Sequence, residues 1–272
     1  MFQPPDKVID LSNPVSESMP VWPTLPSVTL EQSAWAARDG FTMEMVEMST
    51  HTGTHTDSPL HFLPEGKTLE EFPIEKFMGE GVVLDLTPKE PEAEITVAEL
   101  EAFEDEIGAG DVVMLHTGWD QYHGRTPEYL FEFPYLTADA AEYLASLGPK
   151  AVGTDGASVG GWAGEVDAHG PATTDTMPDE SHVPLLKNDI LPVEELRNLG
   201  DVMDGADCQA LRPGSKPSVV GTGGEPPPTA RSGPDLPSRS APGSPHWAWL
   251  MVPTARKVSL PHSNCIVRAC GP

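Results

Sequence analysis

Short apolar runs alternate with amphipathic segments over much of the chain. The runs 82–86, 112–116 and 151–154 are four or five residues long, and turn-forming or polar residues follow them, which is typical of buried strands. The segment 41–48 is a further predicted strand, and it leads into a cluster of histidines. The pattern therefore predicts a sheet whose strands are largely buried.

Two amphipathic segments between these strands carry helix signals. In 96–110, a Thr and a Glu three residues apart form a predicted capping box, and two glycines at the far end stop the helix. In 137–147, Thr137 is the predicted N-cap, and Gly148 followed by Pro ends the helix. The order strand, helix, strand, helix, strand predicts an α/β fold with helices packed on a sheet.

The composition changes abruptly near residue 207. Residues 208–272 contain all three cysteines and seven basic residues but only two acidic ones, Glu225 and Asp235. Pro, Gly and Ser are so dense there that long helices or strands are not expected. We therefore divide the chain into a body, residues 1–207, and a basic tail, residues 208–272. The tail is either a natural disordered extension or an out-of-frame sequence.

The formal net charge of −26, from 16 Lys and Arg against 42 Asp and Glu, narrows the possible partners. Nucleic acid requires a basic face, and an anionic membrane surface would repel this chain, so we expect neither as a partner. The charge indicates either a heavily solvated surface or adaptation to high salt. No apolar stretch reaches the roughly 18 residues of a membrane span, and no signal-peptide pattern opens the chain, so we expect a cytoplasmic protein.

Three of the nine histidines fall within the sequence His51-Thr-Gly-Thr-His55-Thr-Asp57-Ser-Pro-Leu-His61. Imidazole and carboxylate groups together suit Zn²⁺, Mn²⁺ or Fe²⁺. Gly, Thr and Pro oppose a helix, so we predict an extended segment in which His55 and Asp57 share a face. Gly53 permits the bend that brings His51 to them. Three protein ligands leave open coordination positions, which is typical of a catalytic metal site.

His61 lies just beyond a proline and is either a fourth ligand or a general base. A loop of hydrogen-bonded histidines without a metal is the alternative interpretation of the whole cluster. A metalloprotease is disfavoured, because the chain has no HExxH motif and no Glu lies between His51 and His55 to act as the base.

The cluster resembles the motif HxGTHxDxPxHF of the cyclase family, which includes bacterial kynurenine formamidases and isatin hydrolase. Every fixed position of that motif is met from His51 to Phe62. Other segments similar to the family are Asp-Leu-Ser at 10–12, Met-Pro-Val-Trp-Pro at 19–23, His-Thr-Gly-Trp at 116–119 and Gly-Thr-Asp-Gly-Ala-Ser-Val at 153–159. The resemblance implies a swivelling β/β/α domain of the kynurenine formamidase type, assembled as a homodimer or homotetramer.

The resemblance also implies one or two divalent ions, Zn²⁺ or Mn²⁺. The three predicted ligands would hold the first, and Asp57 would bridge to a second. In the formamidases of the family a His and a Glu twelve residues apart bind that second ion, and His182 and Glu194 match this spacing. His169 is the competing histidine. A solvated carboxylate at the start of a helix is the alternative interpretation of Glu194.

The reaction that the resemblance implies is hydrolysis of a small amide, such as the aryl formamide N-formylkynurenine, to an amine and formate. A cyclic amide like isatin or a lactone is the alternative substrate, and a non-catalytic metal- or ligand-binding relative is the alternative of a different class. His61 is implied as the catalytic acid or base, or else it only orients the metal ligands. We expect Trp22, Phe62 and Trp119 to line an aromatic substrate pocket, unless they are core residues.

The tail provides a first test. Family members usually have a late strand with the sequence Gly-Ser-Pro-x-Arg-Ala, and residues 221–231 are at best a distorted copy of it. We expect limited proteolysis of the purified protein to cleave within 208–272 and to leave the body intact, because this composition opposes a packed core. A reading frame confirmed by resequencing, together with a protease-resistant tail, would refute the out-of-frame hypothesis.

Overall fold

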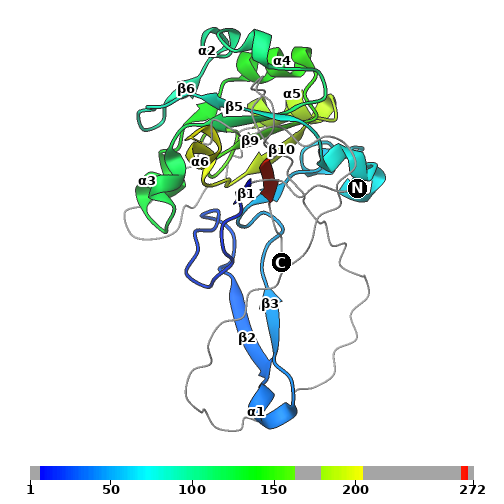
Figure 1. The fold of residues 1–272 in the computed structure, drawn as a ribbon, viewed down its shortest axis with the longest axis vertical. Helices are drawn as coiled ribbons and strands as arrows, with labels where there is room; N and C mark the ends of the chain where they lie inside the picture. The colour runs from blue at the N-terminus through cyan, green and yellow to red at the C-terminus, as the bar shows by residue number, and fades with distance from the viewer. Residues whose placement is uncertain (1–6, 163–178, 205–264, 269–272) are drawn as a thin grey trace.

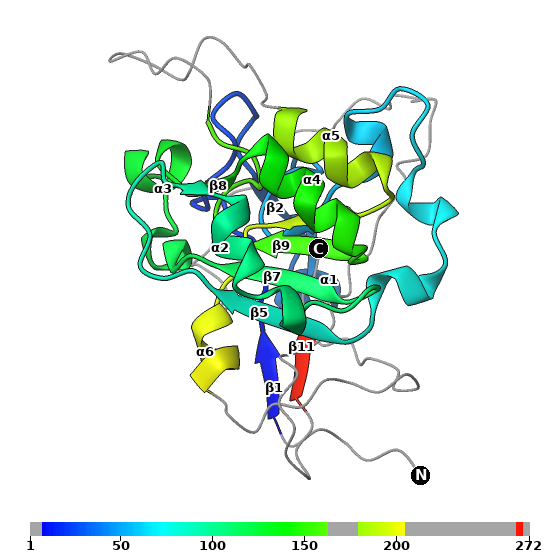
Figure 2. The same cartoon turned by 90° about the horizontal axis from the view of Figure 1, so that it is seen from above.

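The computed structural model describes residues 7–162, 179–204 and 265–268. A five-stranded sheet with the order β4-β10-β9-β7-β5 forms the centre of this part of the chain (Figure 2). Four of its strands run parallel, and the edge strand β4 is antiparallel to its neighbour β10. The strands are β4 (His55–Thr56), β5 (Gly81–Asp85), β7 (Val112–His116), β9 (Ala151–Thr154) and β10 (Leu191–Glu194).

Side chains of the central strands alternate between two buried cores, as the two-residue repeat of a strand requires. Leu84, Val113 and Leu115 pack toward a first core with residues of the helices α2 (Val97–Glu101), α4 (Ala138–Leu147) and α5 (Asp179–Lys187). Val83 and Met114 point to the other face, where residues of β1 (Lys7–Asp10) and α6 (Leu199–Asp204) cover the sheet. Both faces are therefore buried, which explains the almost continuous apolar runs in the sequence.

A second, two-stranded sheet lies beside the α6 face. It consists of β1 and β11 (Cys265–Arg268), which run parallel with Lys7 opposite Cys265 (Figure 2). The layers are thus a small sheet, the main sheet and the helices, and the predicted mixed α/β class is confirmed. The backbone of β11 belongs to the tail, and residues 208–264 lie outside the described part of the chain. The division of the chain near residue 207 therefore stays a prediction.

A two-stranded ribbon projects away from these layers (Figure 1). It consists of β2 (Thr29–Ala34) and β3 (Met43–Glu47), and α1 (Ala36–Asp39) connects the two strands at its tip. Every residue of β3 is exposed, including Met43, Met45 and Val46. The remaining elements are β6 (Glu94–Ile95), β8 (Tyr135–Leu136), α3 (Pro127–Phe131) and the 3-10 turns Pro59–His61, Leu69–Glu71, Ile74–Phe77, Glu104–Glu106 and Trp119–Tyr122.

The predicted helices form, but one is shorter than expected. Thr137 accepts a hydrogen bond from the Ala140 N–H, and Gly148 ends α4 with a φ of 73°, as predicted. The capping box at the start of α2 is also present, yet α2 ends at Glu101 and a 3-10 turn, Glu104–Glu106, follows. Acidic side chains crowd this end, where the helix dipole favours positive charge, and this opposes continuation of the helix to residue 108.

Among the described residues, no helix combines the length and the apolar character that crossing a membrane requires. This finding agrees with the absence of long apolar stretches in the sequence.

Leu115 lies in the interior strand β7 with its side chain fully buried. We expect Leu115→Ala to lower the free energy of unfolding by about 2–5 kcal/mol, because it removes buried methyl groups and leaves a cavity. The matched control Val46→Ala, on the exposed face of the ribbon, should change it by less than about 0.5 kcal/mol. Denaturant titration followed by circular dichroism measures both, and equal effects would contradict this account of the core.

Candidate metal centre

The sheet edge fixes the histidine segment in the bent, extended form that the sequence predicts. Gly53 has a φ of 68°, which side chains rarely adopt, and the chain turns there before entering β4. Two bonds then tie the segment to β10: the Asp57 N–H and the Thr56 hydroxyl both donate to the Pro192 carbonyl, at 3.1 and 2.7 Å. His55 and Asp57 therefore project from a strand whose position the main sheet determines.

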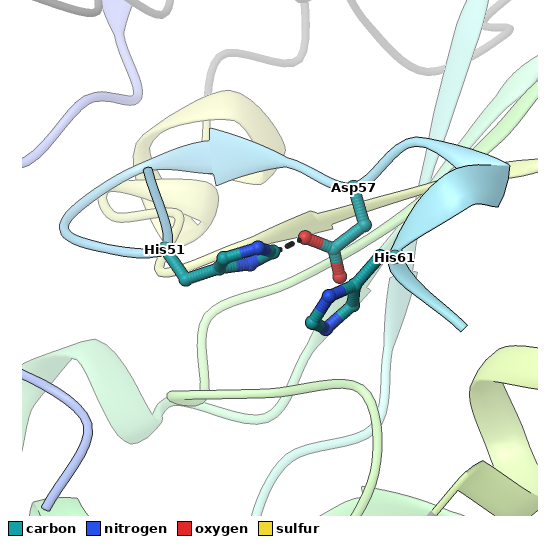
Figure 3. Close-up of side chains that lie close together, drawn as sticks. All are labelled: His51, Asp57 and His61. Atoms are coloured by element: carbon teal, nitrogen blue, oxygen red, sulfur yellow. Dashed lines mark ion pairs between the residues drawn. The ribbon is translucent and has the colours of Figure 1, made fainter. Parts of the chain in front are cut away.

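Asp57 is the centre of the cluster, and it is only 2% exposed. Its Oδ1 lies 2.9 Å from His51 Nδ1 and 3.5 Å from His55 Nε2, and its Oδ2 lies 3.7 Å from His182 Nε2. Figure 3 shows the His51 and His61 rings both turned toward this carboxylate. The structure therefore brings the three predicted ligands of the first ion together.

His182 and Glu194 complete the cluster from two other elements. His182 projects from α5 and Glu194 ends β10, and His182 Nε2 lies 3.1 Å from Glu194 Oε1. The Ser158 hydroxyl and the Val159 N–H also donate to Glu194 Oε1, both at 2.9 Å. The alternative interpretation of Glu194 as a solvated residue at a helix start is wrong, because it is a buried strand residue. The competing His169 lies outside the described residues.

The donor set fits divalent cations. Among the described residues, no well-aligned hydrogen bond satisfies either Asp57 carboxylate oxygen or His55 Nε2, although all three atoms are buried and such atoms are normally satisfied. Their nearest polar neighbours are other imidazoles and carboxylates of the cluster. Ligand atoms around one tetrahedral ion lie roughly 3.3 Å apart, and the contacts of 2.9 to 3.7 Å within the cluster bracket that spacing. Within the described ranges the converging donors form two sets of three, His51 with Asp57 and His61, and His55 with Asp57 and Glu194. Asp57 is common to both, which suits a carboxylate shared by two ions.

The charges of the cluster favour the ionised forms of its members. Burial alone would lower the pKa of His55, but Asp57 and Glu194 beside it raise that pKa to about 10. Burial would raise the pKa of Asp57, but His51 and His55 hold it well below its usual range. Burial and Asp57 would raise the pKa of Glu194, but His182 and His55 lower it. Without a cation, the site therefore holds its carboxylates as anions and takes up a proton at His55.

His61 sits at the rim of the cluster in the 3-10 turn Pro59–His61. Its ring stacks on His51 with the centroids 4.0 Å apart, and Phe62 packs against its edge at 4.4 Å. Burial lowers the pKa of His61, so the neutral imidazole dominates at pH 7. The geometry is compatible with both predicted roles, a ligand beside His51 or a proton acceptor.

A cavity of about 190 Å³ opens onto the cluster. Its polar wall includes His51, His55, His61 and His182, and its apolar wall includes Val21, Trp22, Leu25 and Leu130. The predicted aromatic residues take different places. Trp22 lines the cavity, whereas Phe62 is not among the described residues that line it and instead packs on His182, with the ring centroids 4.7 Å apart. Trp119 is 3% exposed and belongs to a core with Tyr129 and Phe133, so core packing describes it.

Two cavity residues, Glu195 and Tyr129, were not anticipated from the sequence. Neighbours in a strand point to opposite faces, so a Glu beside the strand residue Glu194 is expected to point away from the site. Glu195 instead has a φ of 55°, which breaks the alternation of the strand, and both glutamates line the cavity. The available signal was the pair of adjacent acidic residues at the end of an apolar run.

The raised pKa of His55 predicts proton release on metal binding. His55 carries a proton in the metal-free site at pH 7.5, and an imidazole must lose its proton before it can bind an ion. We expect about one proton released per Mn²⁺ bound, seen in calorimetry as a binding enthalpy that follows the ionisation enthalpy of the buffer. The variant His55→Gln should lose this dependence, and a buffer-independent enthalpy in the wild-type protein would contradict the assignment.

Comparison with known proteins relates this geometry to a family. A family model described as "Putative cyclase" matches residues 9–160, more than half of the chain. Kynurenine formamidase from Bacillus cereus is 31% identical over 153 residues, 56% of this chain and 69% of the relative. Kynurenine formamidase from Erythrobacter litoralis is 29% identical over 201 residues, 73% of this chain and 82% of the relative.

Solved structures agree with the sequence comparison. Isatin hydrolase A from Labrenzia aggregata superposes with a TM-score of 0.60 at 25% identity, over 71% of this chain and 82% of that one. A protein described as a potential metal-dependent hydrolase with cyclase activity gives a TM-score of 0.53 at 26% identity, over 70% and 81% of the two chains. The matched residues include the whole histidine segment and the motifs at 116–119 and 153–159. The chain belongs to the Cyclase family.

Proposed function

We propose that this chain is a metal-dependent hydrolase that cleaves the amide bond of a small aryl formamide. The observation that carries the proposal is the buried Asp57, which joins two sets of cation ligands at the wall of a closed-in cavity. A structural metal site is usually shut off by its four protein ligands, whereas a site bordering a cavity leaves room for water and substrate. The names of the relatives, kynurenine formamidase and isatin hydrolase, support amide hydrolysis.

The cavity supports a small substrate with an aromatic ring. Its volume of about 190 Å³ holds a compound of roughly one ring and a short chain, and Trp22 with Leu25 and Leu130 offers an apolar wall. N-formylkynurenine is the first candidate, because two relatives of comparable length carry that activity in their names. A cyclic amide is the second candidate, because isatin hydrolase A shares the fold over 71% of this chain.

In the proposed mechanism the protein residues position the reactants and move protons. The buried carboxylates and imidazoles would hold one or two divalent ions, which supply Lewis acidity and lower the pKa of water. His61 is neutral at pH 7 and reaches the cavity, so it accepts a proton from the water that attacks the amide carbonyl. It then gives this proton to the nitrogen of the amine that departs as the C–N bond breaks. Ser158, which donates to Glu194, keeps that carboxylate oriented for its role as a ligand.

His61→Ala tests this mechanism. We expect it to reduce kcat/KM for N-formylkynurenine by about 10²- to 10⁴-fold, the usual contribution of a positioned acid–base group. The assay follows the absorbance of the released aryl amine, with Mn²⁺ or Zn²⁺ present and in high salt. His116→Ala is the matched control, because His116 is a partly buried histidine at the end of β7 and does not line the cavity.

The metal content of the variants separates the two roles of His61. Retained metal with lost turnover supports the proton-transfer role, whereas lost metal makes His61 a ligand. A folded, metal-loaded wild-type protein that hydrolyses neither N-formylkynurenine nor isatin would reject the proposed function in favour of a non-catalytic binding protein.

A further inference from the structure

Glu195 is a further buried acidic residue at the cavity, and it does not belong to the cluster of proposed metal ligands. Its side chain is 6% exposed, and it is not a member of either set of converging ligands. Its backbone is firmly held: the N–H donates to the Gly156 carbonyl at 3.1 Å, and the carbonyl accepts from Asn13 Nδ2 at 2.7 Å and from the Thr54 hydroxyl. With its backbone held in the left-handed conformation, Glu195 thus lines the cavity from a rigid support.

The charge of Glu195 is poorly compensated by the protein. Within the part of the chain that the structure describes, no Lys or Arg lies within 4.0 Å of its carboxylate. The Tyr129 hydroxyl donates to Oε2 at the long distance of 3.5 Å, and His123 Nε2 lies 3.6 Å from the same oxygen. Arg125, from the same loop as His123, instead donates to the carbonyls of Met19 and Glu17. A carboxylate removed from water needs stronger partners than these.

The contrast with Glu194 indicates what is missing. Glu194 accepts two hydrogen bonds at 2.9 Å and faces His182 at 3.1 Å, so the protein itself prepares it for a cation. Glu195 has a fixed position and an open side toward the same cavity, but its contacts within the protein are long. The missing partner is therefore a hydrogen-bond donor that arrives through the cavity, and a positively charged donor suits a carboxylate best.

We propose that Glu195 is a specificity-determining residue that accepts a hydrogen bond from a protonated amino group of the substrate. This inference rests on the proposed function and narrows it, since it makes the substrate an amide that carries a separate primary ammonium group. In this arrangement the aromatic ring of the substrate packs against the apolar wall around Trp22, and the amide that is cleaved lies at the proposed metal ligands. The ammonium group of the substrate donates to Glu195. N-formylkynurenine has this combination of groups, whereas isatin has no ammonium group.

The test compares N-formylkynurenine with its desamino analogue, the same molecule with hydrogen in place of the amino group. The wild-type protein should favour the aminated compound in kcat/KM. Glu195→Gln keeps the shape of the side chain and removes its charge, and we expect it to reduce that preference by about 10- to 100-fold, mainly through KM. Tyr129→Phe, which removes the hydroxyl donor to Glu195, should reduce the preference less. Glu142→Gln, at an exposed position of α4, is the control and should retain the preference.

Equal losses on both compounds in Glu195→Gln would overturn the inference, because they would mean that the carboxylate only supports the fold of the site. An unchanged preference would also overturn it and would leave His123 as the sufficient partner of Glu195. Binding of the products separates this inference from the proposed function. If the wild-type protein hydrolyses neither compound, calorimetry with kynurenine and desaminokynurenine decides: a preference for kynurenine that Glu195→Gln abolishes supports the role of Glu195, and equal or absent binding rejects it.

Discussion

The structure depends on the burial of one carboxylate, that of Asp57. Moving a carboxylate from water into the protein interior costs several kcal/mol of free energy unless neighbouring groups offset it. Here the neighbouring imidazoles can offset the charge of Asp57, whereas a second carboxylate, that of Glu194, adds to the cost. Two like charges so close together are stable only with positive charge between or beside them. In the metal-free protein, a protonated His55 supplies part of this positive charge. Divalent cations would supply more of it.

This requirement explains how the elements are arranged. The cluster draws members from an edge strand, from a helix and from the end of an interior strand, and the edge strand is paired directly with that interior strand, with His55 opposite Glu194. The family motif at 153–159 has its function here, because Ser158 and Val159 anchor Glu194. Asp155 in the same segment accepts hydrogen bonds from the N–H groups of Thr117 and Gly118, and it thereby joins the two strand-end motifs. Burial raises the pKa of this carboxyl group to about 6.

The parts of the site that the sequence could predict are local. His51, His55 and Asp57 lie within seven residues, so their chemistry and the bend at Gly53 could be inferred from spacing alone. The pairing of His182 with Glu194 depends on how α5 packs beside β10, and only the family resemblance pointed to it. Glu195 escaped prediction because a single left-handed residue reverses the direction that strand alternation assigns to it. Trp119 illustrates the opposite difficulty, since a buried aromatic residue and a pocket aromatic residue look alike in a sequence.

The strands and helices were likewise predictable from the sequence where their signals are local. Apolar runs and caps located β5, β7, β9 and α4 closely, because their signals lie within each segment. The helix α5 carries a proline, Pro184, and its apolar pattern is weak, so packing against α4 and the sheet stabilises it more than its own sequence does.

The short edge strand β4 has a kinetic consequence. Only two residue pairs join β4 to β10, although this strand carries His55 and leads into Asp57. Fraying of such an edge needs far less free energy than unfolding the sheet interior. The proposed metal ligand on β4, His55, can therefore separate from the proposed ligand on β10, Glu194, while β5, β7 and β9 stay paired. Ion exchange would then proceed by local opening, and the amide hydrogens of residues 55–57 would exchange with solvent much faster than those of β7.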